Sequence, residues 1–346
     1  MTALSCGVLV PCRDEAGVIE RRLANLARLE WPGGARHRLV VVDDGSRDAT
    51  AELARGALAP LRALGVEAEV LENDVRPGKN GAIEAGLALL AGVDVVVLTD
   101  ADVVTSAGAL VALERALASE PRLGMASGAQ TFVRALEPDG RAPGEEGAGL
   151  EPCGAGWDRL TAVVRRLESR AGKLFSVHGQ WLAWRADLAL APAPGVAADD
   201  VDLMLRVRAS ARPRVALVEG ARFFEEKPGG EELGEAQALR RARAWFQVFA
   251  EPGRPPLRGL DAVQRAVYAH LPRRLPELQL LLVAAALAAV LLPSPWPWGL
   301  VSAVVLGLLA LSPPGREWAR ITRTIRRARR AEARGAMGEA WESLRG

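Results

Sequence analysis

Four short apolar runs, each followed by a polar turn, most strongly constrain the fold of this chain. They are Cys6–Val10, Leu39–Val42, Glu67–Leu71 and Asp94–Thr99. Short valine- and leucine-rich runs of this kind are typical of buried parallel strands. Helical spacing separates them, over Val18–Leu29, Ala49–Leu64 and Gly81–Leu90. This alternation predicts a doubly wound, mostly parallel α/β sheet, which binds ligands at the carboxyl ends of its strands.

The composition fits one large α/β domain with an appendage. The 346 residues are 49% hydrophobic and 25% charged, which allows a sizeable core. The net charge is only +2, so the overall charge does not indicate a nucleic-acid partner. Cys6, Cys12 and Cys153 show no metal-binding spacing and indicate a reducing compartment. The first residues lack the pattern of a signal peptide, so we expect the bulk of the chain to stay in the cytoplasm.

Acidic residues follow the first two predicted strands. The first strand ends in Pro11-Cys12-Arg13-Asp14-Glu15, and the second in Asp43-Asp44-Gly45-Ser46. Carboxylates at a strand end can accept hydrogen bonds from the base or ribose of a nucleotide. The alternative is structural, because Asp-Gly-Ser is an ordinary turn and Ser46 or Asp48 can cap the next helix.

A glycine-flanked lysine and a pair of aspartates follow the third and fourth strands. Lys79 precedes a predicted helix, a position that suits a diphosphate, although the segment lacks the P-loop pattern. Asp100 and Asp102 stand at alternate positions after the fourth strand. Mg²⁺ and Mn²⁺ prefer oxygen ligands and often bridge to substrate phosphates. The pair therefore predicts a site for one of these cations.

These motifs, in this order, resemble the nucleotide-binding half of family 2 glycosyltransferases. The resemblance implies a Rossmann-like GT-A fold, a nucleotide-diphosphate sugar as donor, and a metal held by Asp102 with Asp100 nearby. It extends over about residues 4 to 250. The donor-binding residues that it implies are Pro11, Arg13, Glu15, Asp43, Asp44, Lys79, Asp100, Arg240 and Arg243.

The resemblance continues in the second half of the predicted domain. Ser176–Asp187 is similar to the family's acceptor-side segment, and the acceptor-side residues that we select in it are His178, Gln180 and Trp181. Ala198–Leu203 matches the acidic motif that opens a helix and supplies the general base. We select Asp200 as the base and Asp199 as the second choice. Structural alternatives remain for these residues: the aspartates can simply cap the helix, His178 can be a structural hydrogen-bonding residue, and Trp181 can belong to the core.

The expected reaction is transfer of a single sugar, with inversion, to a hydroxyl or phosphate acceptor. Gln237–Trp245 resembles the family's Gln/Arg/Trp motif only loosely, because Trp245 is displaced from Arg240, and this argues against a processive polymer synthase. A nucleotidyltransferase is a rival, but it should carry a glycine-rich loop with Arg and Lys after the first strand. A catalytically silent, nucleotide-sugar-binding membrane scaffold should have lost Asp102 or Asp200.

The C-terminal part carries two apolar arms, Leu278–Leu292 and Gly299–Leu311, joined by a Pro/Trp turn. Each arm is shorter than the ~20 residues of a usual span, so a pair of buried core helices is the alternative. Tryptophans at one end and arginines on both flanks favour a transmembrane hairpin, and hence a cell-membrane location with a cytoplasmic catalytic domain. A membrane location favours a lipid or polyprenyl phosphate as the acceptor.

Two further segments bear on the membrane. Trp157–Leu174 is an amphipathic pattern, either a surface helix packed on the domain or a helix at a membrane interface. The arginine-rich tail is either a solvated helix or lies against anionic lipid. The expected organisation is a nucleotide-sugar-binding half (1–135), an acceptor-binding half (136–250), a linker (251–277), the transmembrane helical hairpin (278–311) and a basic helical tail (312–346).

Overall fold

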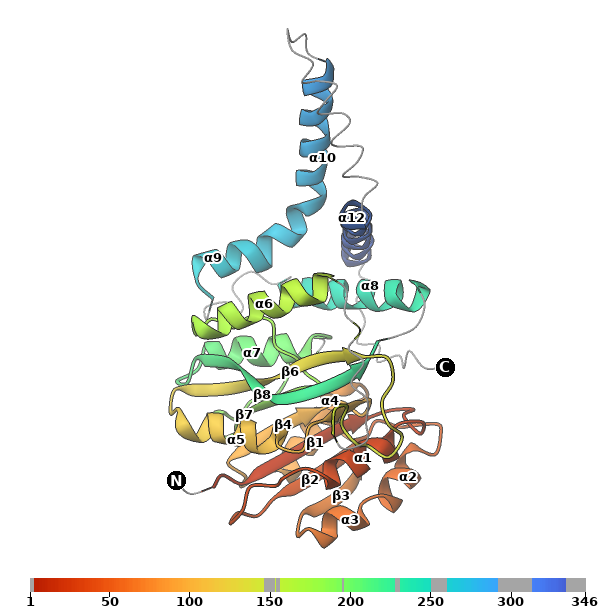
Figure 1. The fold of residues 1–346 in the computed structure, drawn as a ribbon, viewed down its shortest axis with the longest axis vertical. Helices are drawn as coiled ribbons and strands as arrows, with labels where there is room; N and C mark the ends of the chain where they lie inside the picture. The colour runs from red at the N-terminus through yellow and green to blue at the C-terminus, as the bar shows by residue number, and fades with distance from the viewer. Residues whose placement is uncertain are drawn as a thin grey trace. The chain divides into compact units, whose positions relative to one another are not determined.

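The structure is a computed structural model that describes residues 3–145, 153, 156–194, 196–227, 231–249, 260–291 and 313–333. The chain divides into two compact units (Figure 1). Unit 1 is built on Met1–Pro228, and unit 2 on Gly229–Pro252 and Leu260–Gly338. The predicted boundary between residues 135 and 136 falls inside unit 1, and the five-segment division stays a prediction.

Unit 1 contains an eight-stranded mixed sheet with the strand order β3-β2-β1-β4-β7-β6-β8-β5. Its strands are β1 (Cys6–Cys12), β2 (Arg38–Asp43), β3 (Glu67–Glu72), β4 (Val95–Thr99), β5 (Val103–Thr105), β6 (Leu123–Val133), β7 (Trp181–Arg185) and β8 (Arg214–Glu226). The first four pair in parallel, which confirms the four predicted strands. The prediction of a mostly parallel sheet holds only for this half, because β7 pairs antiparallel with both β4 and β6, and β5 antiparallel with β8.

The helices of unit 1 are α1 (Ile19–Ala27), α2 (Thr50–Gly56), α3 (Ala59–Ala63), α4 (Lys79–Leu89), α5 (Ala109–Ser119), α6 (Gly156–Arg170) and α7 (Asp199–Arg208). The pattern over Ala49–Leu64 predicts one helix, but the chain forms α2 and α3. The break has a local cause, since Pro60 lies in the first turn of α3, where its missing N–H is tolerated, whereas inside one continuous helix it would remove a hydrogen bond.

Helices cover both faces of the parallel half of the sheet. Val8, Val10 and Val41 belong to the same buried core cluster as the apolar residues of α1, α3 and α5. Leu9 and Val42 point to the other face, toward α4. There Gly86 allows close approach, because a Cβ on it would lie only 2.2 Å from Leu9 Cδ1 and 2.9 Å from Val42 Cγ2. The doubly wound arrangement predicted for this part of the chain is confirmed.

Unit 2 is helical. It comprises α8 (Glu231–Val248), α9 (Ala262–Gln264), a π-helical segment (Arg265–His270), α10 (Leu271–Leu291) and α12 (Pro313–Ala333). Phe246, Ile325 and Ala328 form its small buried cluster. Within the described ranges, no helix is both long and apolar enough to cross a membrane. Most of the first predicted arm lies in α10, the second arm lies outside the described residues, and the transmembrane hairpin is therefore not found.

Candidate functional site

The loops that follow β1 and β2 are tied to each other by hydrogen bonds. The Asp14 N–H donates to Ser46 Oγ at 2.9 Å, and the Arg47 N–H donates to Asp14 Oδ1 at 2.7 Å. The Glu15 N–H donates to Thr50 Oγ1 at 2.8 Å. Asp14 has a φ of 52°, a left-handed conformation that Asp and Asn tolerate better than most residues. The predicted donor residue Glu15 is thus held at the carboxyl edge of the sheet, next to the turn that follows β2.

Asp44 is a structural centre of this edge rather than a free acceptor. Its carboxylate accepts the Gly78 N–H at 2.9 and 3.0 Å and the Asn73 side-chain amide at 2.6 Å, and Arg13 Nη1 lies 3.4 Å away. The side chain is 2% exposed. Asp43 is also buried and accepts hydrogen bonds from the Ser46 N–H and hydroxyl. Pro11, also among the predicted donor residues, pairs with Val42 inside the sheet. Asp44 therefore fixes the loop that leads to Lys79.

Lys79, the first residue of α4, bridges two acidic segments from different parts of the chain. Its Nζ lies 2.9 Å from Asp100 Oδ1 and 3.3 Å from Asp199 Oδ2. Burial lowers the pKa of this ammonium, but the charges of Asp100, Asp199 and Asp200 outweigh burial and raise the pKa well above its usual value. Lys79 is therefore a fixed positive charge, and it brings the two acidic motifs predicted from the sequence into one site.

Asn80 completes this junction, although nothing in its local sequence singled it out. Its buried side-chain amide donates to the carbonyl oxygens of Ala193 and Val196, at 3.0 and 2.7 Å. These carbonyls belong to the segment that leads into α7, where Asp199 is the first residue. Asn80 thus anchors the start of α7 beside the start of α4.

Asp200 is a partly exposed residue at the start of α7, and backbone N–H groups hold its carboxylate. Its Oδ2 accepts the Gly179 N–H at 3.3 Å, and its Oδ1 accepts the Val201 N–H at 2.8 Å. Burial, followed by the charge of Asp199, raises the pKa of Asp200 to about 6, against the opposing effect of Lys79. The N-cap residue of α7 is Ala198, and it makes no side-chain cap hydrogen bond, so the bond of Asp200 to the adjacent Val201 N–H is not a helix cap. A carboxyl group with this pKa still accepts a proton near neutral pH.

The acceptor-side segment lies against Asp200 through Gly179, where a Cβ would come within 3.2 Å of Asp200 Cβ. His178 is buried, its N–H donates to Ser127 Oγ at 3.1 Å, and Arg165 Nη1 lies 2.5 Å from its Nε2. Gln180 contributes its backbone carbonyl, which accepts the Thr99 hydroxyl at 2.8 Å. Trp181 is fully buried in the core. This burial matches the core alternative for Trp181, and its role on the acceptor side stays a prediction.

Asp100 and Asp102 lie in the turn between β4 and β5, and both are partly exposed. Among the residues with described positions, no three or more His, Cys, Asp or Glu side chains form a complete metal cage. Two carboxylates fit Mg²⁺ or Mn²⁺ nonetheless, since these ions commonly take one or two protein carboxylates and complete their shell with water and substrate phosphates. These two carboxylates are therefore suited to a metal that binds together with a nucleotide diphosphate.

A buried arginine, which no sequence motif indicates, lies beneath this acidic turn. Arg22 of α1 is fully buried, and its guanidinium donates to Thr99 Oγ1 at 2.5 Å and lies 5.4 Å from the Trp181 ring centre. Burial lowers its pKa to about 9, while the charges of Asp100 and Asp102 act in the opposite direction. Arg22 is therefore still charged at neutral pH and faces the carboxylates from the core side.

The remaining predicted residues, Arg240 and Arg243, lie in α8 of unit 2. Their role in donor binding stays a prediction.

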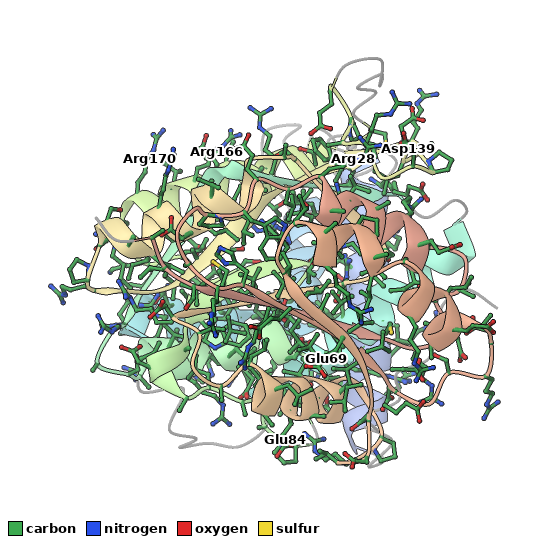
Figure 2. The ribbon with its side chains drawn as sticks, turned by 90° about the horizontal axis from the view of Figure 1, so that it is seen from below. Arg28, Glu69, Glu84, Asp139, Arg166 and Arg170 are labelled. Atoms are coloured by element: carbon green, nitrogen blue, oxygen red, sulfur yellow. The ribbon has the colours of Figure 1, made fainter. Side chains whose placement is uncertain are left out.

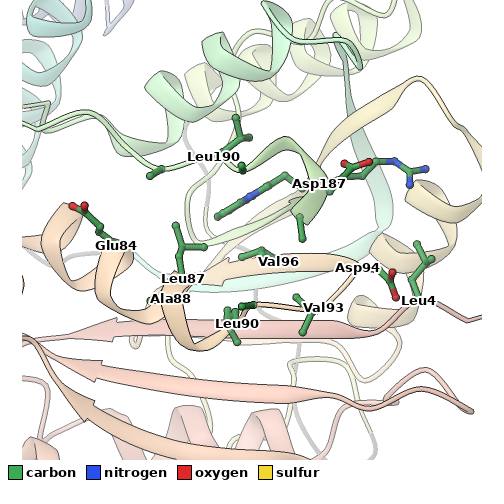
Figure 3. A pocket seen from close by; sticks show the side chains of 17 residues that line it. Leu4, Glu84, Leu87, Ala88, Leu90, Val93, Asp94, Val96, Asp187 and Leu190 are labelled. Carbon is green, nitrogen blue, oxygen red and sulfur yellow. The ribbon is translucent and has the colours of Figure 1, made fainter.

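A separate pocket of about 640 Å³ lies away from this chemistry (Figure 3). It is lined by Leu87 and Leu90 of the α4 end, by Val93 and Asp94 just before β4, and by Asp187 after β7. Asp100 follows the carboxyl end of β4, whereas Val93 and Asp94 precede its amino end. The pocket is thus at the opposite edge of the sheet and does not belong to the candidate site.

Comparisons with known proteins agree with the fold and with the family resemblance over part of the chain. Residues 7–131 match the family described as Glycosyl transferase family 2, which confirms the predicted resemblance over that range. The range includes Asp43, Lys79 and Asp102 but not Asp199 or Asp200. No curated protein sequence gives a significant match.

Solved structures resemble the chain over a longer range. A mannosyltransferase from Pyrobaculum calidifontis, in complex with GDP-Man and Mn²⁺, is 23% identical with a TM-score of 0.67, covering 95% of this chain and 86% of that one. Glucosyl-3-phosphoglycerate synthase from Mycobacterium tuberculosis, in complex with Mn²⁺, UDP and glucosyl-3-phosphoglycerate, is 19% identical with a TM-score of 0.47, covering 72% and 82%. The first likeness shows that the fold is shared.

The contacts of Asp44 lead to a prediction about stability. Asp44→Ala leaves the Gly78 N–H, the Asn73 amide and Arg13 without their shared acceptor, so we expect a loss of about 3 kcal/mol in the free energy of unfolding. Urea denaturation measures it. The matched control is Asp74→Ala, which removes an exposed carboxylate from the same loop and should change stability by less than about 0.5 kcal/mol. Equal stability of the two variants would refute the structural role of Asp44.

Proposed function

We propose that this chain is an inverting glycosyltransferase that moves a single sugar from a nucleotide-diphosphate sugar to a hydroxyl or phosphate acceptor. The observation that carries the proposal is the double ion pair of Lys79 with Asp100 and Asp199, which brings the acidic turn after β4 next to the start of α7, where Asp200 follows Asp199. The family match over residues 7–131 supports the donor half of the proposal.

Asp102 and Asp100 would hold Mg²⁺ or Mn²⁺ together with the donor diphosphate. When bound, the ion would neutralise negative charge that develops on the leaving nucleoside diphosphate. The Mn²⁺ in the Pyrobaculum mannosyltransferase complex supports this assignment. Lys79 adds a fixed positive charge at the same edge, and its position at the N-terminus of α4 suits a phosphate.

Asp200 takes the proton of the acceptor hydroxyl. The raised pKa, about 6, keeps it largely deprotonated at neutral pH and still basic enough to receive a proton. The backbone N–H groups of Gly179 and Val201 hold the carboxylate in place, and Gly179 keeps the acceptor-side segment close to it. A single displacement at the anomeric carbon, with the base on the side opposite to the diphosphate, inverts the configuration.

A membrane address is part of the proposal. Arginines flank both apolar arms of the C-terminal sequence, so we propose that the chain acts at the cell membrane with its catalytic part in the cytoplasm and with a lipid-linked or membrane-proximal acceptor. Fractionation of cells that express the full chain tests this. We expect the protein in the membrane fraction, also after a wash with high salt. Its recovery in the supernatant at low salt would contradict the proposed membrane location.

The metal assignment can be tested at Asp102. Asp102→Asn should abolish sugar transfer and weaken Mn²⁺ binding in the presence of the nucleoside diphosphate by at least about ten-fold, since a neutral amide replaces an anionic ligand. Calorimetric titration with Mn²⁺ measures binding without turnover. Asp187→Asn, at the other edge of the sheet, is the control and should bind like the parent protein. Full transfer in excess chelator would remove the metal from the mechanism.

The role of Asp200 can be separated from helix capping by a pH profile. In the parent protein, turnover should rise with pH through an apparent pKa of about 6, because the base works only when deprotonated. Asp200→Asn should leave donor affinity nearly unchanged, lower turnover by about 10²–10⁴-fold and abolish this acidic limb. Turnover is measured at saturating donor and acceptor, and donor affinity is measured separately.

Asp199→Asn is the matched control for this test. It removes one carboxylate from Lys79 but keeps Asp200, so a smaller loss of turnover and a retained acidic limb are expected. Near-normal turnover in Asp200→Asn together with an inactive Asp199→Asn would move the base by one residue. Near-normal turnover in both variants would refute the mechanism.

A further inference from the structure

Helix α6 turns its polar side toward the body of unit 1. Arg165 contacts His178 at 2.5 Å and donates to Ser176 Oγ at 3.2 Å. Ser169 Oγ accepts the Leu217 N–H at 2.8 Å, and Glu168 Oε2 accepts the Phe175 N–H at 3.2 Å. Charged and hydroxyl side chains thus attach α6 to the segment before β7 and to β8.

The apolar side of the same helix faces outward. Leu160, Val163, Val164 and Leu167 share one face at helical spacing and are 52%, 48%, 42% and 59% exposed. Helix α1 shows the usual arrangement, with its large apolar residues Ile19, Leu23 and Leu26 fully buried. Four neighbouring exposed aliphatic side chains on one helix face mark an interaction surface, because hydration of such a stripe is unfavourable.

Basic residues flank this stripe. Arg166 and Arg170 lie next to each other on α6 and are exposed, and Figure 2 shows both pointing away from the ribbon. With Arg214 they line a shallow pocket of about 260 Å³ between α6 and β8. Glu219 lies 3.5 Å from Arg166, and Glu120 lies 2.7 Å from Arg214. The flank still carries a net positive charge, with three arginines and two carboxylates.

We propose that the outward face of α6 docks on an anionic lipid bilayer. Leu160, Val163, Val164 and Leu167 would enter the boundary between headgroups and acyl chains, and Arg166 and Arg170 would contact lipid phosphates. An exposed aliphatic stripe bordered by arginines is the composition of helices that lie in a membrane interface, and each basic residue near an anionic surface adds about 1 kcal/mol. A protein surface without an acidic patch would not match this basic flank.

The same face is coupled to the candidate site. Arg165 links α6 to His178, and the adjacent Gly179 contacts Asp200. A bilayer under α6 would therefore lie next to the segment expected to receive the acceptor. This docking surface adds to the membrane-proximal reaction proposed above. It can be tested independently of that reaction, because vesicle binding requires no sugar transfer.

The test places a probe on α6 of the full chain. Val164→Cys, in a Cys153→Ser background, is labelled with an environment-sensitive fluorophore, and Leu64→Cys, an exposed aliphatic position at the end of α3, is the matched control. We expect a blue shift at position 164, and quenching by acyl-chain quenchers, with vesicles that contain phosphatidylglycerol but not with pure phosphatidylcholine. Position 64 should not respond. The fluorescence reports only the surroundings of position 164. If only the C-terminal segments bound the vesicles, the signal at position 164 would not change, and that result would overturn the proposal.

Paired substitutions test the two components of the surface with the same labelled protein. Leu160→Ser with Leu167→Ser, and separately Arg170→Glu, should each reduce the lipid-dependent signal at position 164 by about ten-fold at a given lipid concentration. Leu64→Ser and Arg115→Glu, which make the same chemical changes at exposed positions elsewhere on unit 1, should not. All variants should retain Mn²⁺-dependent nucleotide binding, which reports folding.

Two further results would overturn the proposal. A probe at position 164 that is already shielded without vesicles would mean that protein covers this face. An equal response to neutral and anionic vesicles would mean that the arginines take no part. Loss of sugar transfer with an intact lipid response at position 164 would refute the proposed reaction and leave the docking surface standing.

Discussion

The arrangement of the candidate site depends on one cation held between carboxylates. Lys79 Nζ lies 2.9 Å from Asp100 and 3.3 Å from Asp199, residues that are far apart in the sequence and belong to different turns. Without a positive charge between them, these carboxylates and their neighbours Asp102 and Asp200 would repel one another at the edge of the sheet. Asp44 and Asn80 hold Lys79 in this position. Asp44 accepts the N–H of the preceding Gly78, and the Asn80 side chain bonds carbonyls of the segment before α7.

The charges around this junction do not balance, and the imbalance fits the proposed chemistry. Lys79 faces the carboxylates from α4, and Arg22 faces them from the core, where burial lowers its pKa to about 9 but leaves it protonated at neutral pH. Four carboxylates, Asp100, Asp102, Asp199 and Asp200, and these two cations leave two excess negative charges. A divalent cation would supply that charge, and the charge of Asp199 adds to burial, the larger cause, in raising the pKa of Asp200.

The sequence predicted the parts of the site that depend on chain order. Parallel strands joined by helices place their carboxyl ends at one edge, so Asp43, Lys79 and Asp100 could be assigned to a common site before their contacts were known. Arg22 and Asn80 could not be assigned, because their roles come from tertiary contacts to Thr99 and to the carbonyls before α7. The mixed half of the sheet was also missed, since antiparallel pairing of β7 with β4 leaves no local signal in a buried apolar run.

Helix α6 shows a more general limit of sequence periodicity. Spacing identifies which residues share a helix face, and it correctly placed Leu160, Val164 and Leu167 together, but it does not say which face meets the protein. The usual assumption is that the apolar face turns inward. Here Arg165, Glu168 and Ser169 turn inward, because polar groups of the neighbouring segments, including His178 and the Leu217 N–H, require partners when they are removed from water. Once these polar contacts fix the rotation of the helix, its apolar residues must face outward. The exposed stripe is therefore a consequence of how the acceptor-side segment is held, and any surface that covers the stripe must lie beside that segment.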